Sequence, residues 1–398
     1  MPLTDSYAAA RVRRVADRPL ARPRVDTEDH VPDDLAPHDG SARLRIALVA
    51  PPILPVPPPA YGGTERVVHA LAGSLQQLGH DVTVFASGDS RTAGHLVPTV
   101  SRGCWTGGGT DIEDAFARTN DAVARHWHRF DVIHSHLEAR GFPLARASPT
   151  PIVSTLHGRL DDPLTAVGLA HYPELPLIAI SQSHRSTYPA ANWVGVVHNG
   201  QDLHELPFGP VPGDYLLFIG RATREKGIDA AIRAAALAGE RLVIAAKIRD
   251  AGETEAFETE VRPVLGRGSV EFVGEVSGDV RDRLFAGAKA TLMLDDWPEP
   301  FGLVAIESMA TGTPVIATPC GALPEIVTDG IDGAIVRNAA EAAGAVREVA
   351  RLDRRRIRLR ALGRFSASRM TAEYLKLYRR VIADAASAGT PELATTPR

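Results

Sequence analysis

Short apolar runs alternate with longer amphipathic segments along most of the chain. The runs are rich in Val, Ile and Leu, as is typical of strands that a parallel sheet buries on both faces. They are LRIALVA, DVTVFAS, DVIHSH, PIVSTLH and LIAIS in the first half of the chain, and YLLFIG, RLVIAA, SVEFVG, ATLML and PVIAT in the second half. Because strand and helix patterns follow each other repeatedly, we predict a parallel α/β architecture.

The segments between these runs carry apolar residues at helical spacing. In TERVVHALAGSLQQLGH, the side chains of Val67, Leu71, Leu75 and Leu78 fall on one face of a helix that Gly79 ends. The stretches DIEDAFARTNDAVARHWHRF and ASRMTAEYLKLYRRVIADAAS are also predicted to be helices.

The two series of strands indicate two domains. A chain of 398 residues is too long for one ordinary core, since a domain usually holds about 150 residues. The loop HELPFGPVPGD, rich in proline and glycine, marks the linker. We expect doubly wound, Rossmann-like domains at residues 43–208 and 213–368. The amphipathic helix expected at 369–388 can pack on either domain, and crossing back to the first domain is one of these two arrangements. Ligands then bind in the cleft between the two sheets.

Residues 1–41 differ from the rest of the chain. They are rich in Arg, Asp and Pro and hold few large apolar side chains, so they are predicted to form a disordered leader.

Composition excludes several classes of partner. The formal net charge is −4, with 44% hydrophobic and 23% charged residues. The protein therefore has no overall electric field that would attract nucleic acid, and any anion site must be local.

Two distant cysteines, Cys104 and Cys320, fit a reducing cytoplasm. No apolar run approaches the roughly 18 residues needed to span a bilayer. The arginine-rich segment RLDRRRIRLR, residues 351–360, is predicted to be a solvated helix face, with a membrane-surface patch as the alternative.

Two glutamates flank the start of one predicted helix. Glu299 precedes an apolar run and Glu307 falls in its second turn. The amides of Phe301, Gly302 and Leu303 are then helix N-terminal donors for an anion. A carboxylate accepts paired hydrogen bonds from vicinal hydroxyl groups, such as those of a ribose or a hexose.

Cations and glycines follow two other predicted strands. Arg221 and Lys226 lie in GRATREKG and suit a diphosphate. Gly62 and Gly63 follow the first strand, where a backbone without side chains can approach an anion or a sugar oxygen. A diphosphate between two sets of hydroxyl groups describes a nucleotide sugar. The chain has no GxGxxG or Walker A sequence, which counts against a nicotinamide dehydrogenase or a P-loop ATPase.

Three histidines come near the same predicted sheet edge. His134 and His136 share one face of a strand, and His157 ends the next strand beside Gly158. We interpret His134 as a buried structural residue, His157 as a substrate contact, and His136 as a weaker candidate for the acceptor. A metal site needs a third ligand that the sequence does not identify, so none is assigned.

A hydrolytic function is a separate alternative, because most glycosidases also use a pair of carboxylates. Glycosidases do not need the two cations, Arg221 and Lys226, that suit a diphosphate, so the combination argues against hydrolysis.

In combination these motifs resemble the retaining glycosyltransferases of family 4, which have the GT-B fold. The resemblance covers about residues 43–385 and rests on GGTERVV, HNGQD, GRATREKG, EPFGLVAIE and GTPVIAT followed by GALPEIVTDGIDGAIV. The stretches PPPAYGGTERVV and DVTVFASGD are similar to a bacterial subgroup that includes small-molecule glucosyltransferases and antibiotic-tailoring enzymes. Two positions depart from the family pattern, Ala246 in place of a usual glycine and His198 in place of a usual proline.

The resemblance implies a role for each matching residue. The donor-binding residues are Arg221 and Lys226 for the diphosphate, Glu307 for the ribose, and Phe301, Gly302, Leu303 and Gly63 nearby. Glu299 and His157 lie near the transferred sugar, and Gly62 and His136 are weaker candidates for acceptor binding.

The implied reaction is transfer of a hexose, glucose or mannose, from a nucleotide diphosphate sugar to a hydroxyl group of a small molecule, glycan or lipid. It needs no metal or other cofactor, and UDP-glucose is the first donor to test. The alternatives are a GT-B phosphorylase or epimerase, or a non-catalytic protein that binds nucleotide sugars.

Overall fold

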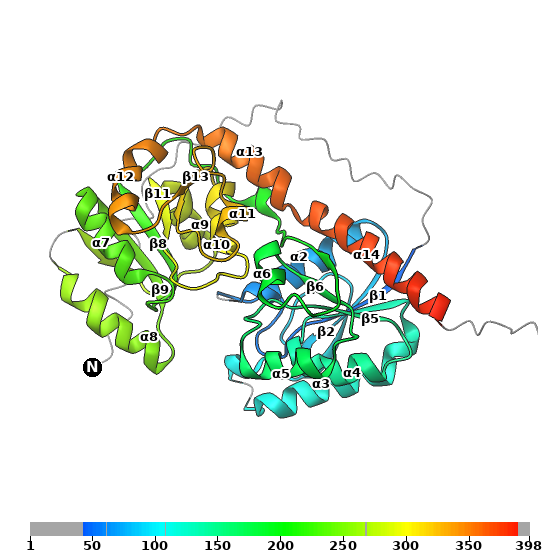
Figure 1. Cartoon of the computed structure of the whole chain (residues 1–398). Coiled ribbons are helices and arrows are strands. Elements are labelled where there is room, and N and C mark those ends of the chain that lie inside the picture. The colour runs from blue at the N-terminus through cyan, green and yellow to red at the C-terminus, as the bar shows by residue number, and fades with distance from the viewer. Residues whose placement is uncertain (1–42, 61, 108, 267–268, 389–398) are drawn as a thin grey trace, which may run out of the picture.

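The computed structural model describes residues 43–60, 62–107, 109–266 and 269–388. These residues form two α/β domains, each built around one parallel sheet (Figure 1). The predicted fold class of two Rossmann-like domains is therefore confirmed. The leader predicted for residues 1–41 lies outside the described part of the chain.

The N-terminal sheet has seven parallel strands in the order β3-β2-β1-β4-β5-β6-β7. The strands are β1 Arg45–Val49, β2 Asp81–Ser87, β3 His95–Val100, β4 Val132–Ser135, β5 Ile152–Thr155, β6 Leu177–Ala179 and β7 Trp193–Val196. The apolar runs predicted all of them except the two edge strands, β3 and β7. These two are less buried than the central strands, so they do not need a continuous apolar sequence, and they contain Pro98 and Gly195.

The C-terminal sheet has six parallel strands in the order β10-β9-β8-β11-β12-β13. The strands are β8 Tyr215–Arg221, β9 Arg241–Lys247, β10 Val270–Phe272, β11 Ala290–Met293, β12 Val315–Ala317 and β13 Gly333–Ile335. The short edge strand β13 is the one that the apolar pattern missed. The pairing of β8 with β9 ends at Arg221 opposite Lys247, which puts two cations side by side at the carboxyl edge of the sheet.

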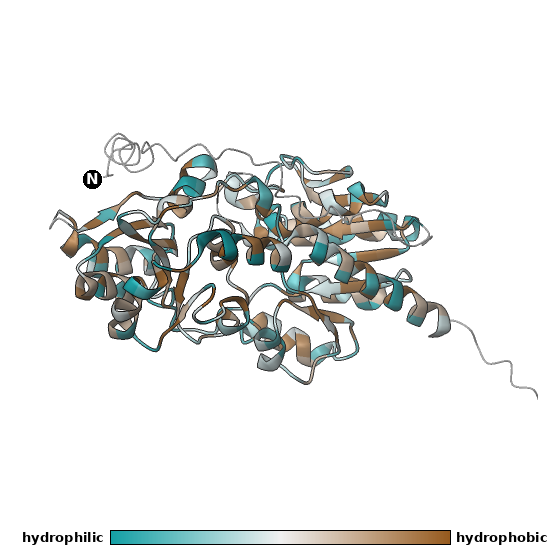
Figure 2. Cartoon of the chain, turned by 90° about the horizontal axis from the view of Figure 1, so that it is seen from above, coloured by the Kyte–Doolittle hydropathy of each residue, from teal (hydrophilic) through white to brown (hydrophobic). Residues whose placement is uncertain are grey.

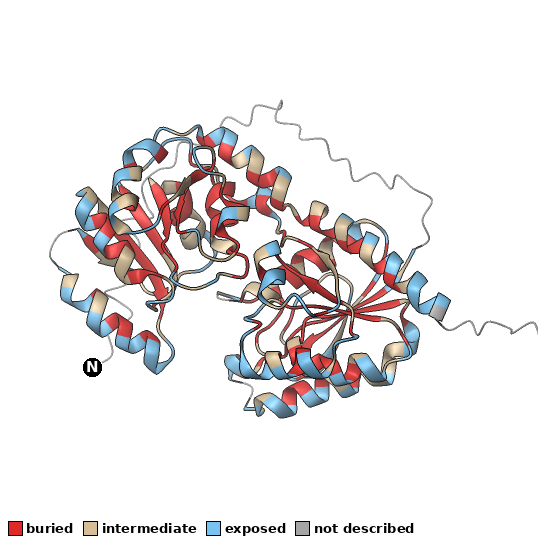
Figure 3. Ribbon diagram, in the orientation of Figure 1, coloured by how far each residue is buried: buried red, intermediate tan, exposed pale blue. Residues whose placement is uncertain are grey.

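Helices cover both sheets and turn their buried sides toward the strands (Figure 3). The strands carry mostly hydrophobic residues, whereas the helices have both hydrophilic and hydrophobic sides (Figure 2). In the N-terminal domain the helices are α2 Gly63–Gln77, α3 Ile112–His126, α4 Phe142–Ala147, α5 Pro163–His171 and α6 Gln182–Thr187. In the rest of the chain they are α7 Ile228–Ala238, α8 Ala251–Ala256, α9 Gly278–Gly287, α10 Leu303–Ala310, α11 Leu323–Ile326, α12 Ala339–Val349, α13 Arg354–Phe365 and α14 Ala367–Ala388.

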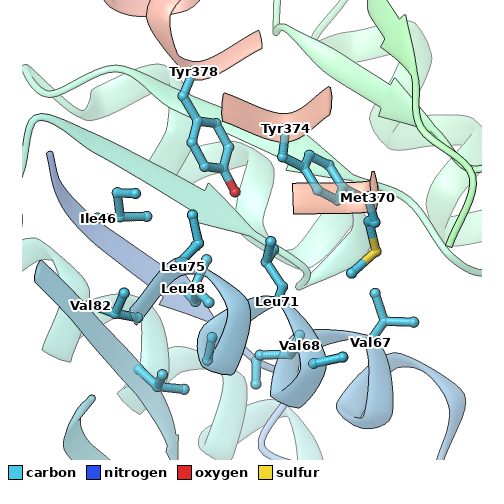
Figure 4. Packing of buried hydrophobic residues seen from close by; sticks show 14 of the residues in the cluster. Ile46, Leu48, Val67, Val68, Leu71, Leu75, Val82, Met370, Tyr374 and Tyr378 are labelled. Atoms are coloured by element: carbon cyan, nitrogen blue, oxygen red, sulfur yellow. The ribbon is translucent and has the colours of Figure 1, made fainter. Parts of the chain in front are cut away.

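The last helix, α14, belongs to the core of the N-terminal domain. Met370, Tyr374 and Tyr378 recur every fourth residue, so they share one helix face. This face is buried against β1 and α2, where it meets Ile46, Leu48, Val67, Leu71 and Leu75 (Figure 4). The chain thus returns to its first domain after completing the second.

The arginine-rich segment 351–360 is only in part the solvated helix face that the sequence predicts, because Arg351, Arg355 and Arg356 are exposed whereas two other arginines point inward. Arg354 is buried and donates to the carbonyl oxygens of Gly209, Ala286 and Ala288. Arg358 donates to the carbonyl oxygen of Leu206 at 2.8 Å. These side chains point inward because the linker and the ends of α9 and α10 present carbonyl oxygens to them, which satisfies buried acceptors.

Among the described residues, no helix is long and apolar enough to cross a bilayer.

Candidate functional site

The first turns of α2 and α10, which come from different domains, meet across the cleft. A Cβ atom on Gly63, the first residue of α2, would lie only 3.1 Å from Cδ1 of Leu303, the first residue of α10. Gly62 and Gly302, which precede the two helices, have φ of 149° and 94°. Among the described residues, neither N-cap position supplies a side-chain hydrogen bond. Apart from the amide of Glu65, which bonds to its own carboxyl group, the first-turn amides therefore remain donors for a ligand, and both helix dipoles favour an anion there.

A pocket of about 150 Å³ opens beside this contact. Both domains line it, α2 and the loop before it from one side, and β8, β9, α9 and α10 from the other. Its charged and glycine residues are Gly62, Gly63, Arg66, Gly220, Lys247, Glu275, Arg281 and Glu307. The predicted ribose ligand Glu307 and the predicted glycine loop therefore face one cavity.

Glu307 lies in the second turn of α10, as predicted, and is buried. Nη1 of Arg281 is 3.5 Å from Oε1 of Glu307. Burial opposes the charge of Arg281, but the carboxylates of Glu307 and Asp282 raise its pKa. Arg66 comes from the opposite domain, and burial lowers its pKa although Glu307 acts in the other direction. The pocket thus holds a carboxylate between two cations.

Lys226 and Glu299 lie together at the carboxyl end of the C-terminal sheet. The Lys226 ammonium group contacts the Glu299 carboxylate and lies 3.8 Å from Oδ2 of Asp295. Burial raises the pKa of Asp295 to about 7, which the charge of Lys226 opposes and that of Glu299 reinforces. One ammonium group therefore lies close to two carboxyl groups.

Arg221 ends β8 and takes part in a chain of charges that crosses the cleft. Its Nη2 is 3.5 Å from Oε2 of Glu225. The other oxygen of Glu225 is 3.5 Å from Nη1 of Arg159, a residue of the N-terminal domain. The Arg159 guanidinium also lies over the ring of Trp297, 5.4 Å from its centroid. The predicted phosphate-binding arginine thus has a carboxylate partner that is shared with the opposite domain.

Close backbone packing fixes the position of Glu299. A Cβ atom on Gly321 would lie 2.2 Å from the carbonyl oxygen of Glu299. Gly321 has φ of 60°, a conformation that favours glycine. Gly227, next to Lys226, approaches the carbonyl oxygen of Leu294 in the same way. Two glycines thereby hold the two halves of the ion pair.

His157 follows β5 and bonds to a second histidine. Its Nε2 is 2.9 Å from Nδ1 of His136, and the two rings stack with centroids 5.1 Å apart. Burial lowers the pKa of His157 to about 3 and that of His136 well below its usual value. His136 is completely buried, so the expectation that it contacts the acceptor is corrected: its ring reaches His157 instead.

His134 is the buried structural residue that the sequence predicted. It has no exposed surface, and its ring nitrogens bond at 2.7 Å to the hydroxyl groups of Tyr378 and Thr155. It therefore links β4 to α14 and β5.

Among the described residues, no three His, Cys, Asp or Glu side chains are grouped as a metal site would require.

Several residues of the site were not predicted from the sequence. They are Arg66, Glu138, Arg159, Glu225, Lys247, Arg281 and Asp295. Lys247 and Asp295 directly follow predicted strands, and Arg66 lies inside the GGTERVV motif. These positions in the sequence could have marked the three residues as candidates. Arg281 lies inside a helix and gave no comparable signal.

Known proteins resemble this chain in sequence and in structure. Residues 61–204 match the family Glycosyltransferase Family 4, and residues 210–364 match Glycosyl transferases group 1. The alpha-maltose-1-phosphate synthase of Mycolicibacterium smegmatis is 30% identical over 85% of this chain and 100% of its own length.

Two solved structures have the same fold. AviGT4, a glycosyltransferase involved in avilamycin A biosynthesis, is 26% identical with a TM-score of 0.68, over 85% of this chain and 98% of that one. Anabaena Alr3699/HepE, solved in complex with UDP-glucose, is 17% identical with a TM-score of 0.66, over 87% of this chain and 100% of that one.

Proposed function

Since the chain belongs to the family 4 glycosyltransferases, we propose that it is a retaining, metal-independent hexosyltransferase. It moves glucose or mannose from a nucleotide diphosphate sugar to a hydroxyl group of a small molecule, glycan or lipid. UDP-glucose is the first donor to test, because a protein of the same fold has been solved with this nucleotide sugar.

One observation carries this proposal, the meeting of two uncapped helix N-termini beside a pocket that contains Glu307. Two helix dipoles and their free amides suit a diphosphate. A buried carboxylate in the same pocket suits the vicinal hydroxyl groups of a ribose. The two features together fit a nucleoside diphosphate better than either does alone.

Arg221 and Lys226 then stabilise the charge that develops on the leaving diphosphate, and the N-terminus of α10 acts in the same sense. Glu299 and His157 contact the transferred sugar. The acceptor approaches the face that the diphosphate leaves, and a phosphate oxygen takes the acceptor proton, so no protein base is needed. Closure of the two domains excludes water and suppresses hydrolysis of the donor.

The first experiment is a thermal-stability screen with UDP, GDP, ADP and dTDP sugars. A ligand at 100 times its Kd adds about 2.7 kcal/mol to the free energy of unfolding. We expect one nucleotide class to stabilise the wild type but not Glu307→Gln or Arg221→Ala, whereas the exposed Glu255→Gln should behave as the wild type. No response to any nucleotide would contradict the proposal.

The second experiment follows the reaction itself. With the donor found, proton NMR of the product reports the anomeric configuration, which we expect to equal that of the donor. Transfer to inorganic phosphate without an acceptor would instead identify a phosphorylase.

A further inference from the structure

We propose that His136 and Glu138 are positioning residues that fix the ring proton and the backbone of His157, leaving its Nδ1–H group for a substrate oxygen. The meaning of this arrangement for catalysis rests on the proposed function. The location of the proton does not, and it can be measured separately.

The hydrogen bond between the two histidines needs one donor and one acceptor. Nδ1 of His136 and Nε2 of His157 are 2.9 Å apart. Burial holds the pKa of both rings far below neutrality, so each ring is neutral and carries one proton. The proton between the rings therefore belongs to either His136 or His157, and the choice sets the tautomer of both.

The surroundings of His136 decide between the two tautomers. Its second nitrogen, Nε2, is buried and has no hydrogen-bond partner among the described residues. If His157 donated, the proton of His136 would sit on this nitrogen and form a buried N–H group without an acceptor, a rare arrangement in folded proteins. If His136 donates from Nδ1, only a lone pair is left unpaired. We therefore place the His136 proton on Nδ1.

His157 then has to carry its own proton on Nδ1. This nitrogen has no hydrogen-bond partner among the described residues. Unlike Nε2 of His136, it is not fully buried. The ring follows β5 beside Gly158, at the carboxyl edge of the sheet. An N–H donor at this edge can bond to a sugar hydroxyl group or a phosphate oxygen, and it keeps this form at every pH at which both rings are neutral.

Glu138 holds the backbone of the same residue. Its Oε1 accepts hydrogen bonds from the amides of His157, at 2.8 Å, and Gly158, at 3.2 Å. Glu138 has φ of 53°, the only positive value among the described residues other than glycine. This backbone conformation is disfavoured for a residue with a side chain. Glu138 adopts it at the point where its carboxylate links the end of β4 to the end of β5.

Histidine-selective ¹⁵N labelling and long-range ¹H–¹⁵N NMR locate the proton directly. His157→Gln assigns the His157 signals by their loss. We expect the Nδ1–H tautomer of His157 in the wild type and in His136→Asn, whose amide can donate from a position close to Nδ1. His136→Leu, which has no donor, should lose this preference. An Nε2–H tautomer in the wild type would overturn the proposal, whether or not a sugar donor has been found.

Kinetics test the consequence. We expect kcat to fall about tenfold in His136→Leu, the rate equivalent of one hydrogen bond, with little change in donor KM and with rescue in His136→Asn. Glu138→Leu should lower kcat, and Glu138→Gln, which keeps an acceptor oxygen, should retain most of it. Equal losses within each pair would show that these residues act only on folding.

Discussion

Lys226 and Glu299 form an ion pair although 73 positions separate them in the sequence. One was predicted to bind the donor diphosphate and the other to contact the sugar. Because the Lys226 ammonium group also lies 3.8 Å from Asp295, its removal leaves two carboxylates side by side where a diphosphate is expected to bind.

Replacing Lys226 should therefore impair the reaction more than the fold. We expect Lys226→Met to lower kcat/KM by about 100-fold or more, because a preorganised charge on the leaving group is lost. Lys289→Met is the matched control, since Lys289 is buried to the same extent as Lys226 but pairs with Glu240 instead of Glu299. Steady-state kinetics with the identified donor checks both, and a Lys226→Met enzyme as active as the control would refute the role.

Gly321 should prove essential for the position of Glu299. A methyl group there would collide with the Glu299 backbone, whereas Gly330, which has φ of 70°, has open space around its missing side chain. Both alanine variants bear the cost of a left-handed conformation, about 1–2 kcal/mol. We expect only Gly321→Ala to lower kcat/KM as well. Urea unfolding together with kinetics separates the two effects, and equal activity of both variants would contradict the prediction.

Glu65 should make the protein less stable as pH rises. Burial raises the pKa of this carboxyl group to about 7, although its own backbone amide and Arg66 act in the other direction. Between its unfolded pKa and pH 7 the folded chain binds more protons than the unfolded chain, so the free energy of unfolding decreases with pH.

The neutral variant Glu65→Gln removes this dependence. Relative to the wild type, it should gain up to about 3 kcal/mol between pH 5 and pH 8. Denaturant unfolding at a series of pH values measures the difference. Glu255→Gln, at an exposed position, should show a difference that does not vary with pH. A flat difference for Glu65→Gln would mean that the buried carboxyl group stays ionised.

Arg354 should stabilise the junction between the linker and the C-terminal domain. Its guanidinium is buried, which lowers its pKa to about 10, and it bonds to Thr313 as well as to three carbonyl oxygens. Arg354→Met leaves these acceptors unpaired and should cost at least about 3 kcal/mol of stability. The exposed Arg356→Met should stay within about 0.5 kcal/mol of the wild type. Thermal unfolding compares the two, and similar Tm values would argue for a solvated helix face after all.

The central strands could be predicted from the sequence because burial on both faces demands continuous apolar residues. β1, β8 and β11 are examples. Three of the four edge strands, β3, β7 and β13, could not, since an edge position requires no such run, whereas the fourth edge strand, β10, has an apolar run and was predicted. The helix that contains Glu307 was predictable for the same reason as the central strands, because it is buried in the interior of its domain.

By itself, the sequence determined the two-domain class and the kinds of residue that bind a nucleotide sugar, because periodicity and short motifs are local properties of the chain. Tertiary structure alone decided which residues meet. His136 and His157 follow two neighbouring strands, β4 and β5, and Arg354 donates to a carbonyl group 145 positions away. Burial then settles what each group does: it makes Arg354 a structural anchor rather than a surface charge, and it gives His136 a histidine as its partner instead of the acceptor.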